Sequence, residues 1–375
     1  YVDALTFMIE ASGLTTGVEV EVTDDNPTIT GKTAYTLTFK GRANETYKYQ
    51  ELDAQGIPTG NESTIFTDGD GKATITGLKK ATPYQISHKK YGSVNGKTAL
   101  VDAKDIAKQF ADDGDQTTTN GKTDKDEKAS NNNVDVVVDA DGNYKVIVKK
   151  DIDHTVEIPD TWGEVKIDLN DKTITGDKAD DNNEAKPGLE FVKDVNSNEH
   201  PGTNLEIVNG TIKGGDGSAK HPAGAAGIGA SGDTADAGII IGSNANVTGG
   251  NGANGTEGKD GGNGGAGIDG NGRLTPTVSG TVTGGNGGKG GDSAAGIPGN
   301  GGNGGTGISA GDKTITINPG GTVKGGDAGN GGNATGDNTN PGGNGGNGGT
   351  GTETTQPGKT DNNGGTTSGG NGGDG

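Results

Sequence analysis

The sequence predicts an all-β protein that begins as an antiparallel β-sandwich and continues as a repeating β-solenoid with glycine-rich excursions. Three observations predict this fold. Alternating apolar and polar stretches fill the first third of the chain, two sequence tokens recur in constant order through the rest, and 78 of the 375 residues are Gly. Apolar residues make up 26% of the chain, against roughly 45–50% in ordinary globular domains, so we do not expect a conventional enzyme core.

The charge balance and the lack of Cys exclude several classes of protein. Lys and Arg number 31 against 51 Asp and Glu, and the net charge of −20 repels nucleic acid and anionic membrane surfaces. Without Cys there is no disulfide, thiolate metal site or cysteine nucleophile. No run approaches the roughly 18–20 apolar residues of a membrane span, and the chain opens at Tyr1, as a processed segment would. We therefore expect an extracellular or cell-surface protein without nucleic-acid partners or membrane insertion.

Residues 1–111 are predicted to form the sandwich. The stretches 18–22 and 35–39 alternate apolar and polar residues as half-buried strands do, and turn sequences such as DAQG and DGDG separate the strands. One helical pattern follows, DAKDIAKQFADD, with Asp102 as its N-cap and Asp105 three residues on. We expect this helix to close the sandwich.

The first strand of the chain is a candidate for assembly. Leu5, Phe7 and Ile9 alternate on one face of residues 1–11, so this strand could complete its own sandwich or be added to that of a neighbouring copy. Both pairings stay open, and the second would make the protein a homopolymer.

The middle of the chain changes composition twice. Residues 112–133 carry many charges and no apolar residue larger than Ala129, which is typical of a linker. Strands resume in residues 134–215, the predicted first coils of the solenoid, with a hairpin expected around the DADG of 139–142. No Phe, Tyr or Trp follows Phe191, so the later coils must pack with small side chains.

Residues 216–355 form the predicted glycine-rich repeat region. Strand-like tokens that precede a glycine pair (NGTIKGG, NANVTGG, SGTVTGG, GGTVKGG) recur at 35 to 41 residues, and a second token (GAAGI, GGAGI, GGTGI, GGTGT) recurs at 40 to 44. This order predicts repeats made of a strand, an outgoing run, a loop and a returning run. We expect disorder only in the Gly-rich tail, residues 356–375, where no strand token follows.

A three-residue glycine register runs through one repeat without a break, and its members are Gly249, Gly252, Gly255, Gly258, Gly261, Gly264, Gly267 and Gly270. This period matches a left-handed helix of about three residues per turn that makes no internal hydrogen bonds, so it predicts a bundle of polyglycine II helices. A flexible linker has the same composition and is the alternative. The regular recurrence of the strand-like tokens argues against it, because a linker does not require a fixed repeat length.

The Asn residues of these runs are expected to point into water; they include Asn263, Asn303, Asn344 and Asn347. Many of them precede Gly, and such pairs deamidate readily when mobile. Because hyperthermophile proteins tend to reduce thermolabile Asn, these pairs favour a mesophilic or cool source.

Two family resemblances follow from particular segments. GEVKIDLNDKTITG at 163–176 and NLEIVNGTIKGG at 204–215 resemble the first coils of right-handed parallel β-helices of the pectate-lyase-like superfamily, as found in bacterial surface proteins. Residues 45–90 resemble the collagen-adhesin B-type or fibronectin-III-like, Ig-like sandwich modules that serve as stalks. The B-type family uses an acidic residue to promote an isopeptide bond, but His88 stands at that place here. The later repeats resemble the glycine-rich repeats of large bacterial cell-surface proteins.

Candidate sites are few. The acidic pair Asp180–Asp181 lies in a polar loop and is interpreted as solvated, and the four His are scattered without metal-ligand spacing, so we predict no catalytic site and no cofactor. GGKGGDSAA at 287–295 fits the nonapeptide of calcium-binding β-rolls, which makes Asp292 a candidate calcium ligand, although Ala294 is small for the large apolar position.

Three functional hypotheses remain. The first is a non-enzymatic structural subunit of an extracellular filament, appendage or surface coat. The second is an adhesin that binds a surface glycan, a protein or ice. The third is a polysaccharide lyase or hydrolase, which the lack of a suitable group of site residues disfavours.

Overall fold

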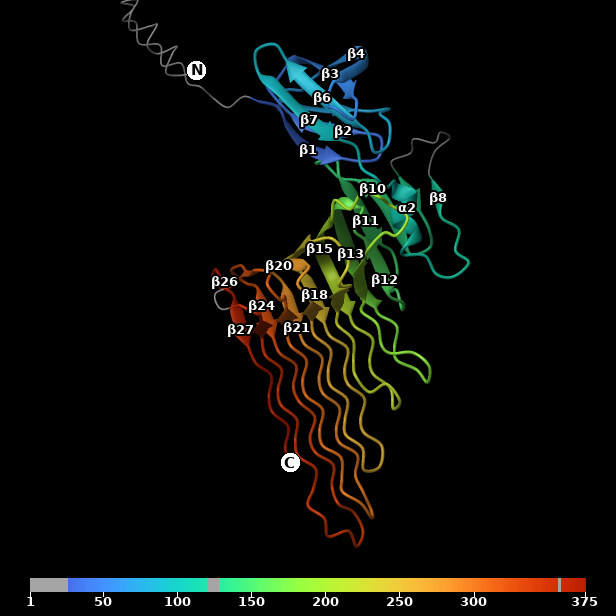
Figure 1. Ribbon diagram of the computed structural model, residues 1–375, viewed down its shortest axis with the longest axis vertical. Helices are drawn as coiled ribbons and strands as arrows, with labels where there is room; N and C mark the ends of the chain where they lie inside the picture. Colours follow the sequence, from blue (N-terminus) through green and yellow to red (C-terminus); the bar gives the residue numbers. More distant parts are fainter. Residues whose placement is uncertain (1–25, 120–127, 357–358) are drawn as a thin grey trace, which may run out of the picture.

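The computed structural model describes residues 26–119, 128–356 and 359–375, and Figure 1 shows their arrangement. Over these residues the protein is nearly all β, with antiparallel sheets first and stacked parallel sheets after them, as the sequence predicts. The assembly strand with Leu5, Phe7 and Ile9, and the alternating stretch 18–22, lie outside the described residues.

Two antiparallel sheets form a sandwich-like unit. One has the order β1-β2-β5 and the other β4-β3-β6-β7. Their bounds are β1 Thr28–Lys32, β2 Leu37–Lys40, β3 Thr46–Leu52, β4 Pro58–Phe66, β5 Lys72–Ile75, β6 Pro83–His88 and β7 Gly92–Lys97. Phe39, Tyr47 and Ile86 are fully buried between the sheets, and the rings of Phe39 and Tyr47 meet edge to face with centroids 5.1 Å apart.

Helix α2 (Ala103–Lys108) begins where the sequence predicts but packs elsewhere. The Asp102 side chain accepts the N–H of Asp105 at 3.0 Å, and Asp105 bonds back to the backbone of Asp102, which completes a capping box. Its buried Ile106 and the following Phe110 belong to the core of the parallel sheets, not to that of the sandwich. The expectation that this helix closes a 1–111 sandwich is therefore corrected: α2 covers the open start of the parallel stack.

The predicted linker at 112–133 is also corrected in its described part. It contains the short paired strands β8 (Thr118–Thr119) and β9 (Ala129–Ser130). Asn131 and Asn133 are buried, and the side-chain amide of Asn131 donates to the Ala107 carbonyl at 2.7 Å and that of Asn133 to the Phe110 carbonyl at 2.6 Å. Polar residues that indicated a linker thus bond to carbonyls at the end of the helix, where the Ala107 carbonyl also accepts the Phe110 N–H at 3.2 Å.

A hairpin of β10 (Val134–Val138) and β11 (Tyr144–Val148) joins the two parts of the molecule, with its turn at DADG as predicted. The sandwich rests on this hairpin. The Ala34 N–H donates to the Tyr144 hydroxyl at 3.0 Å, and the Lys32 N–H donates to the Asn143 side chain at 3.1 Å.

The parallel strands stack in three rows, one strand of each row per coil. The first row continues from β11 through the first halves of β13 and β15 to β17, β20, β23 and β26, and the second row runs from their second halves through β18, β21 and β24 to β27. The third row is β12-β14-β16-β19-β22-β25. The first two rows bend at Asn170, Asp171 and Asn209, whose positive φ values (49°, 60° and 58°) turn the corner.

The bounds of these strands are β12 Val156–Pro159, β13 Gly163–Thr175, β14 Leu189–Val192, β15 Thr203–Lys213, β16 Ile228–Ala230, β17 Ala237–Ile241, β18 Ala245–Thr248, β19 Ile268–Asp269, β20 Leu274–Val278, β21 Thr281–Thr283, β22 Ile308–Ser309, β23 Ile315–Ile317, β24 Thr322–Lys324, β25 Thr352–Glu353, β26 Thr360–Asn362 and β27 Thr366–Ser368. The recurring tokens lie in register. Val247, Val282 and Val323 stack on one another in the second row, and Ile228, Ile268 and Ile308 do so in the third. All six are fully buried in one continuous core, so branched aliphatic side chains replace the missing aromatic ones.

The expected disorder of the tail at 356–375 is corrected for its described part, residues 356 and 359–375. Strands β26 and β27 continue the first and second rows although neither contains an apolar residue, and residues 369–375 form one more outgoing glycine run. Pairing with the preceding coil defines these strands, which their own sequences do not predict.

We predict that Phe110→Ala destabilises the parallel-sheet part by about 3–5 kcal/mol, because it opens a cavity beneath the helical cap. Trp162 is the only Trp of the chain, and its ring centroid lies 6.2 Å from that of Phe110, so denaturant unfolding followed by Trp fluorescence reports on this part. The exposed Lys104→Ala is the control. Equal midpoints for the two variants would contradict the assignment of α2 to the parallel core.

Candidate functional site

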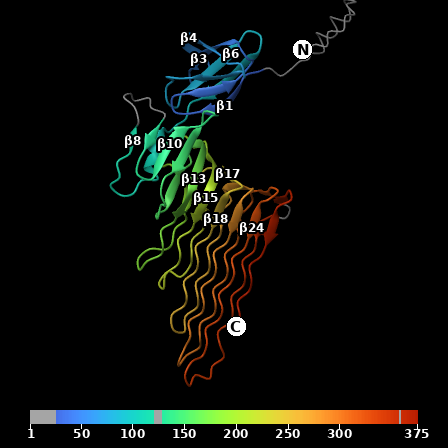
Figure 2. The ribbon, with the colours of Figure 1, turned by 180° about the vertical axis from the view of Figure 1, so that it is seen from behind.

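The most distinctive surface of the molecule is a slab of glycine-rich runs, which we call the glycine slab. It consists of residues 214–227, 249–267, 284–307, 325–351 and 369–375, and each complete run leaves its coil after the second-row strand and returns before the third-row strand. Figures 1 and 2 show the runs side by side in coil order, longer toward the C-terminal end. Outgoing and returning halves form two facing layers that exchange backbone hydrogen bonds.

Close backbone contact explains why so many of these positions are Gly. A Cβ on Gly264 would lie 1.9 Å from the Gly285 carbonyl oxygen, and a Cβ on Gly304 would lie 1.9 Å from that of Gly326. Side chains do not approach other atoms so closely, so any larger residue must push neighbouring runs apart.

The eight glycines of the predicted register share one role. Each donates its backbone N–H to a carbonyl of the next coil, at distances from 2.7 Å (Gly255 to Lys289) to 3.1 Å (Gly258 to Asp292). The register nevertheless does not form one continuous helix. Gly258, with φ +65°, lies in the turn between the outgoing and returning halves, and Gly270 follows the returning strand β19.

Hydrogen bonds within the slab follow the three-residue period in three directions. In the returning run around Asn303, the Gly304 N–H donates to the next coil at 2.9 Å, and the Gly305 N–H donates to Gly285 in the facing layer at 2.8 Å. The third N–H, that of Asn303 itself, donates to the side-chain Oδ1 of Asn263 in the preceding coil at 2.9 Å. A backbone that cannot bond to itself thus finds a partner for each N–H of this triplet.

The Asn side chains provide the unexpected part of this network. Asn263 Oδ1 accepts the N–H of Asn303, while the N–H of the following Gly264 donates to the carbonyl of the same Asn303. One Asn or Asp, together with the residue that follows it, therefore holds one residue of the next coil by two hydrogen bonds, and we call this unit an Asx clamp. The clamping residues are Asp216, Asn251, Asn254, Asp260, Asn263, Asn286, Asp292, Asn300, Asn303, Asp327 and Asn330.

Asn263 and Asn303 are exposed, as expected, and their carbonyl oxygens are in addition structural acceptors. The mesophilic or cool source inferred from the Asn-Gly pairs stays a prediction. Asn recurs directly before Gly at the same place in successive repeats, and this recurrence was the sequence signal for the clamps. The partner of Asn263, however, is Asn303, which lies 40 residues away in the sequence.

Asp292, the candidate calcium ligand, is a clamp residue. Its Oδ1 accepts the Asn333 N–H at 2.8 Å and the Lys289 ammonium at 2.9 Å. These two donors hold the pKa of the Asp292 carboxyl below its ordinary value. Among the described residues, no group of three or more His, Cys, Asp or Glu side chains is arranged to hold a metal ion.

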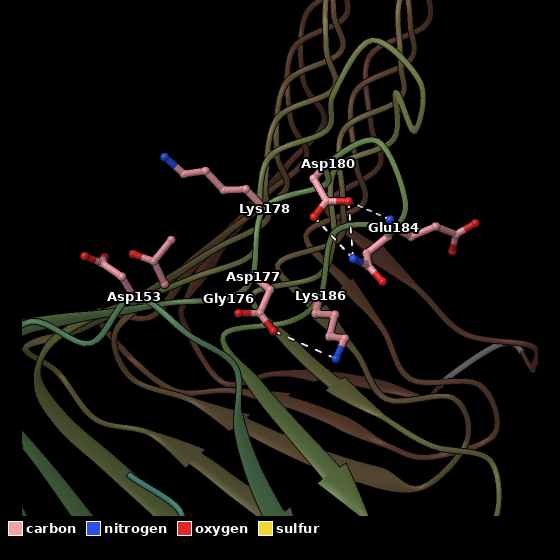
Figure 3. Close-up of a pocket in the computed structure, with 9 residues that line it drawn as sticks. Asp153, Gly176, Asp177, Lys178, Asp180, Glu184 and Lys186 are labelled. Carbon is pink, nitrogen blue, oxygen red and sulfur yellow. Dashed lines mark hydrogen bonds and ion pairs between the residues drawn. The ribbon is translucent and has the colours of Figure 1, made fainter. Parts of the chain in front are cut away.

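A polar hollow of about 600 Å³ lies where the excursion of β13 meets the sheets, and Figure 3 shows its lining. Asp180 turns back on its own loop, where it accepts the N–H groups of Asn182 at 2.6 Å and Asn183 at 2.8 Å, which lower the pKa of its carboxyl. Its neighbour Asp181 instead pairs with Lys220 at 3.4 Å. The structure therefore gives these two carboxylates separate partners rather than one shared site.

A second hollow, of about 450 Å³, lies on the outer face of the first row, and its lining includes Glu164, Lys166, Glu206 and Ile240. Lys166 and Glu206 form an ion pair at 3.0 Å, and Ile240 is 46% exposed.

The two ends of the parallel stack differ. At its start, α2, β8 and β9 cover the first coil. At its end, β25, β26 and β27 are each paired on one side only among the described residues. The last coil also carries Asn-Gly pairs, Asn344–Gly345 and Asn347–Gly348, for which the described chain offers no further coil to clamp.

No protein-family model matches this chain, and no curated protein is significantly similar to it. The fold class is therefore defined by the structure alone, as an all-β protein whose parallel sheets are compatible with a β-solenoid. Within the described ranges, no helix is long and apolar enough to cross a membrane.

We predict that Gly264→Val lowers the free energy of unfolding by roughly 1–3 kcal/mol, because the new side chain must displace the neighbouring run. Ala266→Ser, two residues away at the third position of the triplet, should change it by less than about 0.5 kcal/mol. Denaturant titration of both variants tests this. A flexible linker would tolerate both changes equally, and that result would rule out the packed slab.

We also predict that Asn263→Ala costs about 1 kcal/mol and speeds amide exchange at Asn303, because the Asn303 N–H loses its acceptor. Asn263→Asp is the matched control, since a carboxylate oxygen fills the same place at Asp260 and Asp292. Hydrogen exchange measured at Asn303 separates the two. Unchanged exchange in Asn263→Ala would show that the clamp contributes nothing.

Proposed function

We propose that this chain is a non-enzymatic structural subunit of an extracellular filament, appendage or surface coat. In this proposal the N-terminal unit is an Ig-like module, the parallel stack is a right-handed β-helix, and the slab consists of polyglycine II helices. The observation that carries this proposal is the slab itself, a large element built from backbone contacts in which the glycine N–H groups of the inner coils bond to neighbouring runs.

The faces of the slab disfavour the addition of a third layer of glycine runs. In an extended polyglycine lattice, a third layer would use the third N–H of each triplet. Here many of these N–H groups are bonded to a clamp side chain, as that of Asn303 is to Asn263. Among the described residues, unpaired strand edges lie at β25, β26 and β27, so we propose that further backbone pairing takes place along the axis of the stack.

Unpaired strand edges are templates for association unless something covers them. Two copies that meet at the last coil about a two-fold axis would run antiparallel, with donors facing acceptors, which is a self-complementary contact. A filament needs a second contact, and addition of the strand that carries Leu5, Phe7 and Ile9 to a neighbour's sandwich would supply it. The net charge of −20 opposes non-specific association of the faces.

We predict that the chain self-associates and that Gly372→Pro weakens the association about 3- to 10-fold, since it removes one edge N–H worth roughly 1 kcal/mol. The position has room for a side chain, because a Cβ there would lie 3.9 Å from the nearest heavy atom outside its chain neighbours. Gly372→Ala keeps the N–H and is the control.

Sedimentation velocity over a range of concentrations measures this effect. Single chains at every concentration would refute self-association, and equal affinities for the Pro and Ala variants would exclude the last coil as the contact.

A further inference from the structure

We propose that one outer face of the glycine slab, which is almost free of charge, is an interface with a second copy of this chain. The face belongs to the returning halves of the runs, and we call it the returning face; it comprises residues 223–227, 259–267, 299–307 and 343–351. The inference rests on the proposed structural role and deepens it by naming a lateral contact. It uses neither the edge of the last coil nor the strand at residues 1–11.

The outward side chains of the returning face form straight rows along the stack. Backbone bonds between coils, such as that from the Gly264 N–H to the Asn303 carbonyl, place every third residue of a run beside its counterpart in the next run. The rows are Asp260–Asn300–Asn344, Ala223–Asn263–Asn303–Asn347 and Ala226–Ala266–Thr306–Thr350. Asp260 is the one charged residue in these rows.

The opposite face, formed by the outgoing halves, carries the charges. Lysine–aspartate pairs recur along it, with nitrogen–oxygen distances of 2.9 Å in Lys213–Asp216 and Lys289–Asp292 and 3.5 Å in Lys324–Asp327. Both faces use Asx clamps, so the packing of the slab does not itself require this difference. Because each chain has a net charge of −20, two copies repel each other least where they meet through an uncharged face.

The returning face has ridges and grooves that two identical surfaces can interdigitate. Asn300 and Asn303 are exposed, whereas of the two glycines between them Gly301 is half-buried and Gly302 is buried. The rows are therefore ridges about 9.3 Å apart, and side chains repeat at about 4.8 Å within each ridge. A second copy of the same face has both periods, so its ridges fit the grooves along their whole length. Stacked Asn side chains that interdigitate in this way form the dry interfaces of steric zippers.

The Asn side chains keep hydrogen-bonding capacity for this contact. The clamps use the Oδ1 atoms of Asn263 and Asn303, while among the described residues nothing accepts from their Nδ2 groups. The carbonyls of Gly264 and Gly304 accept no N–H within the same part of the chain. The face therefore offers donors and acceptors together, and it can pair with itself about a two-fold axis. Side chains keep the two backbones apart, so this contact is not a third layer of glycine runs.

The size of the returning face fits a weak and reversible contact. Its four runs, spaced about 4.8 Å apart and rising about 3.1 Å per residue, cover roughly 500 Å² on each copy. A pair of copies would bury about 1,000 Å² in total, which is at the lower end for a specific protein contact.

The first test compares the same substitution on the two faces of one coil. Asn303→Asp adds a carboxylate to the returning face, and Asn286→Asp adds one to the outgoing face. Both keep the clamp, because Asp260 and Asp292 hold the next coil by their carboxylates. In sedimentation velocity at low salt, we expect Asn303→Asp to weaken self-association by about five-fold or more, and Asn286→Asp by less than about two-fold. Salt at about 0.5 M should restore most of the loss.

The outcomes separate this interface from the proposed function. Self-association with equal affinities for the two variants would overturn the returning face as the contact and leave the structural role standing. Single chains at every concentration would overturn both, and would leave the face to a partner other than this chain.

A second test locates the contact directly. The chain contains no Cys, so single-cysteine variants can be linked at chosen positions. Thr306→Cys lies on the returning face and Thr283→Cys on the outgoing face of the same coil, and both threonines are half-buried. At a concentration where the chain self-associates, a flexible bismaleimide should link the Thr306→Cys copies several-fold faster. Equal rates would contradict the proposal.

Discussion

An extended glycine backbone with about three residues per turn cannot satisfy its own N–H groups, and the rest of this structure depends on that constraint. In most triplets of the inner coils, one N–H donates to the next coil and one donates to the facing layer. Many of the remaining N–H groups, including that of Asn303, bond to an Asn or Asp side chain. The stacked parallel strands make this possible because they hold successive coils at a spacing of about 4.8 Å, where backbone groups of neighbouring runs meet.

The same constraint accounts for the ends and faces of the molecule. A stack whose groups bond to the next coil needs a start that requires no earlier coil, and α2 with the buried Asn131 and Asn133 supplies one. The side chains of the Asx clamps use the bonding direction that a third layer would need. Among the described residues, the strand edges that stay unpaired lie at β25, β26 and β27, toward which the glycine runs grow longer. The clamp carboxylates fit this scheme, since the N–H groups that they accept lower the pKa of Asp292 and Asp327.

Local patterns predicted much of the fold, and non-local bonding explains what they missed. The tokens around Val247, Val282 and Val323 predicted stacked strands because buried apolar residues must recur once per coil. The N-cap at Asp102 could be predicted because its partner, Asp105, lies within one helical turn in the sequence. The role of Asn263 as an acceptor could not be predicted, since its partner Asn303 is set by the register between coils. Thr366–Ser368 was missed because it has no apolar residue, and Asn131 was interpreted as linker because a buried amide and a solvated one look alike in sequence.

Native-state hydrogen exchange across residues 249–307 tests the central claim most directly. A packed slab predicts slow exchange at the glycines that bond to the next coil and to the facing layer, such as Gly264 and Gly265, and also at clamped third positions such as Asn303. Uniformly fast exchange through 249–307 would contradict the account and leave these runs as a flexible spacer.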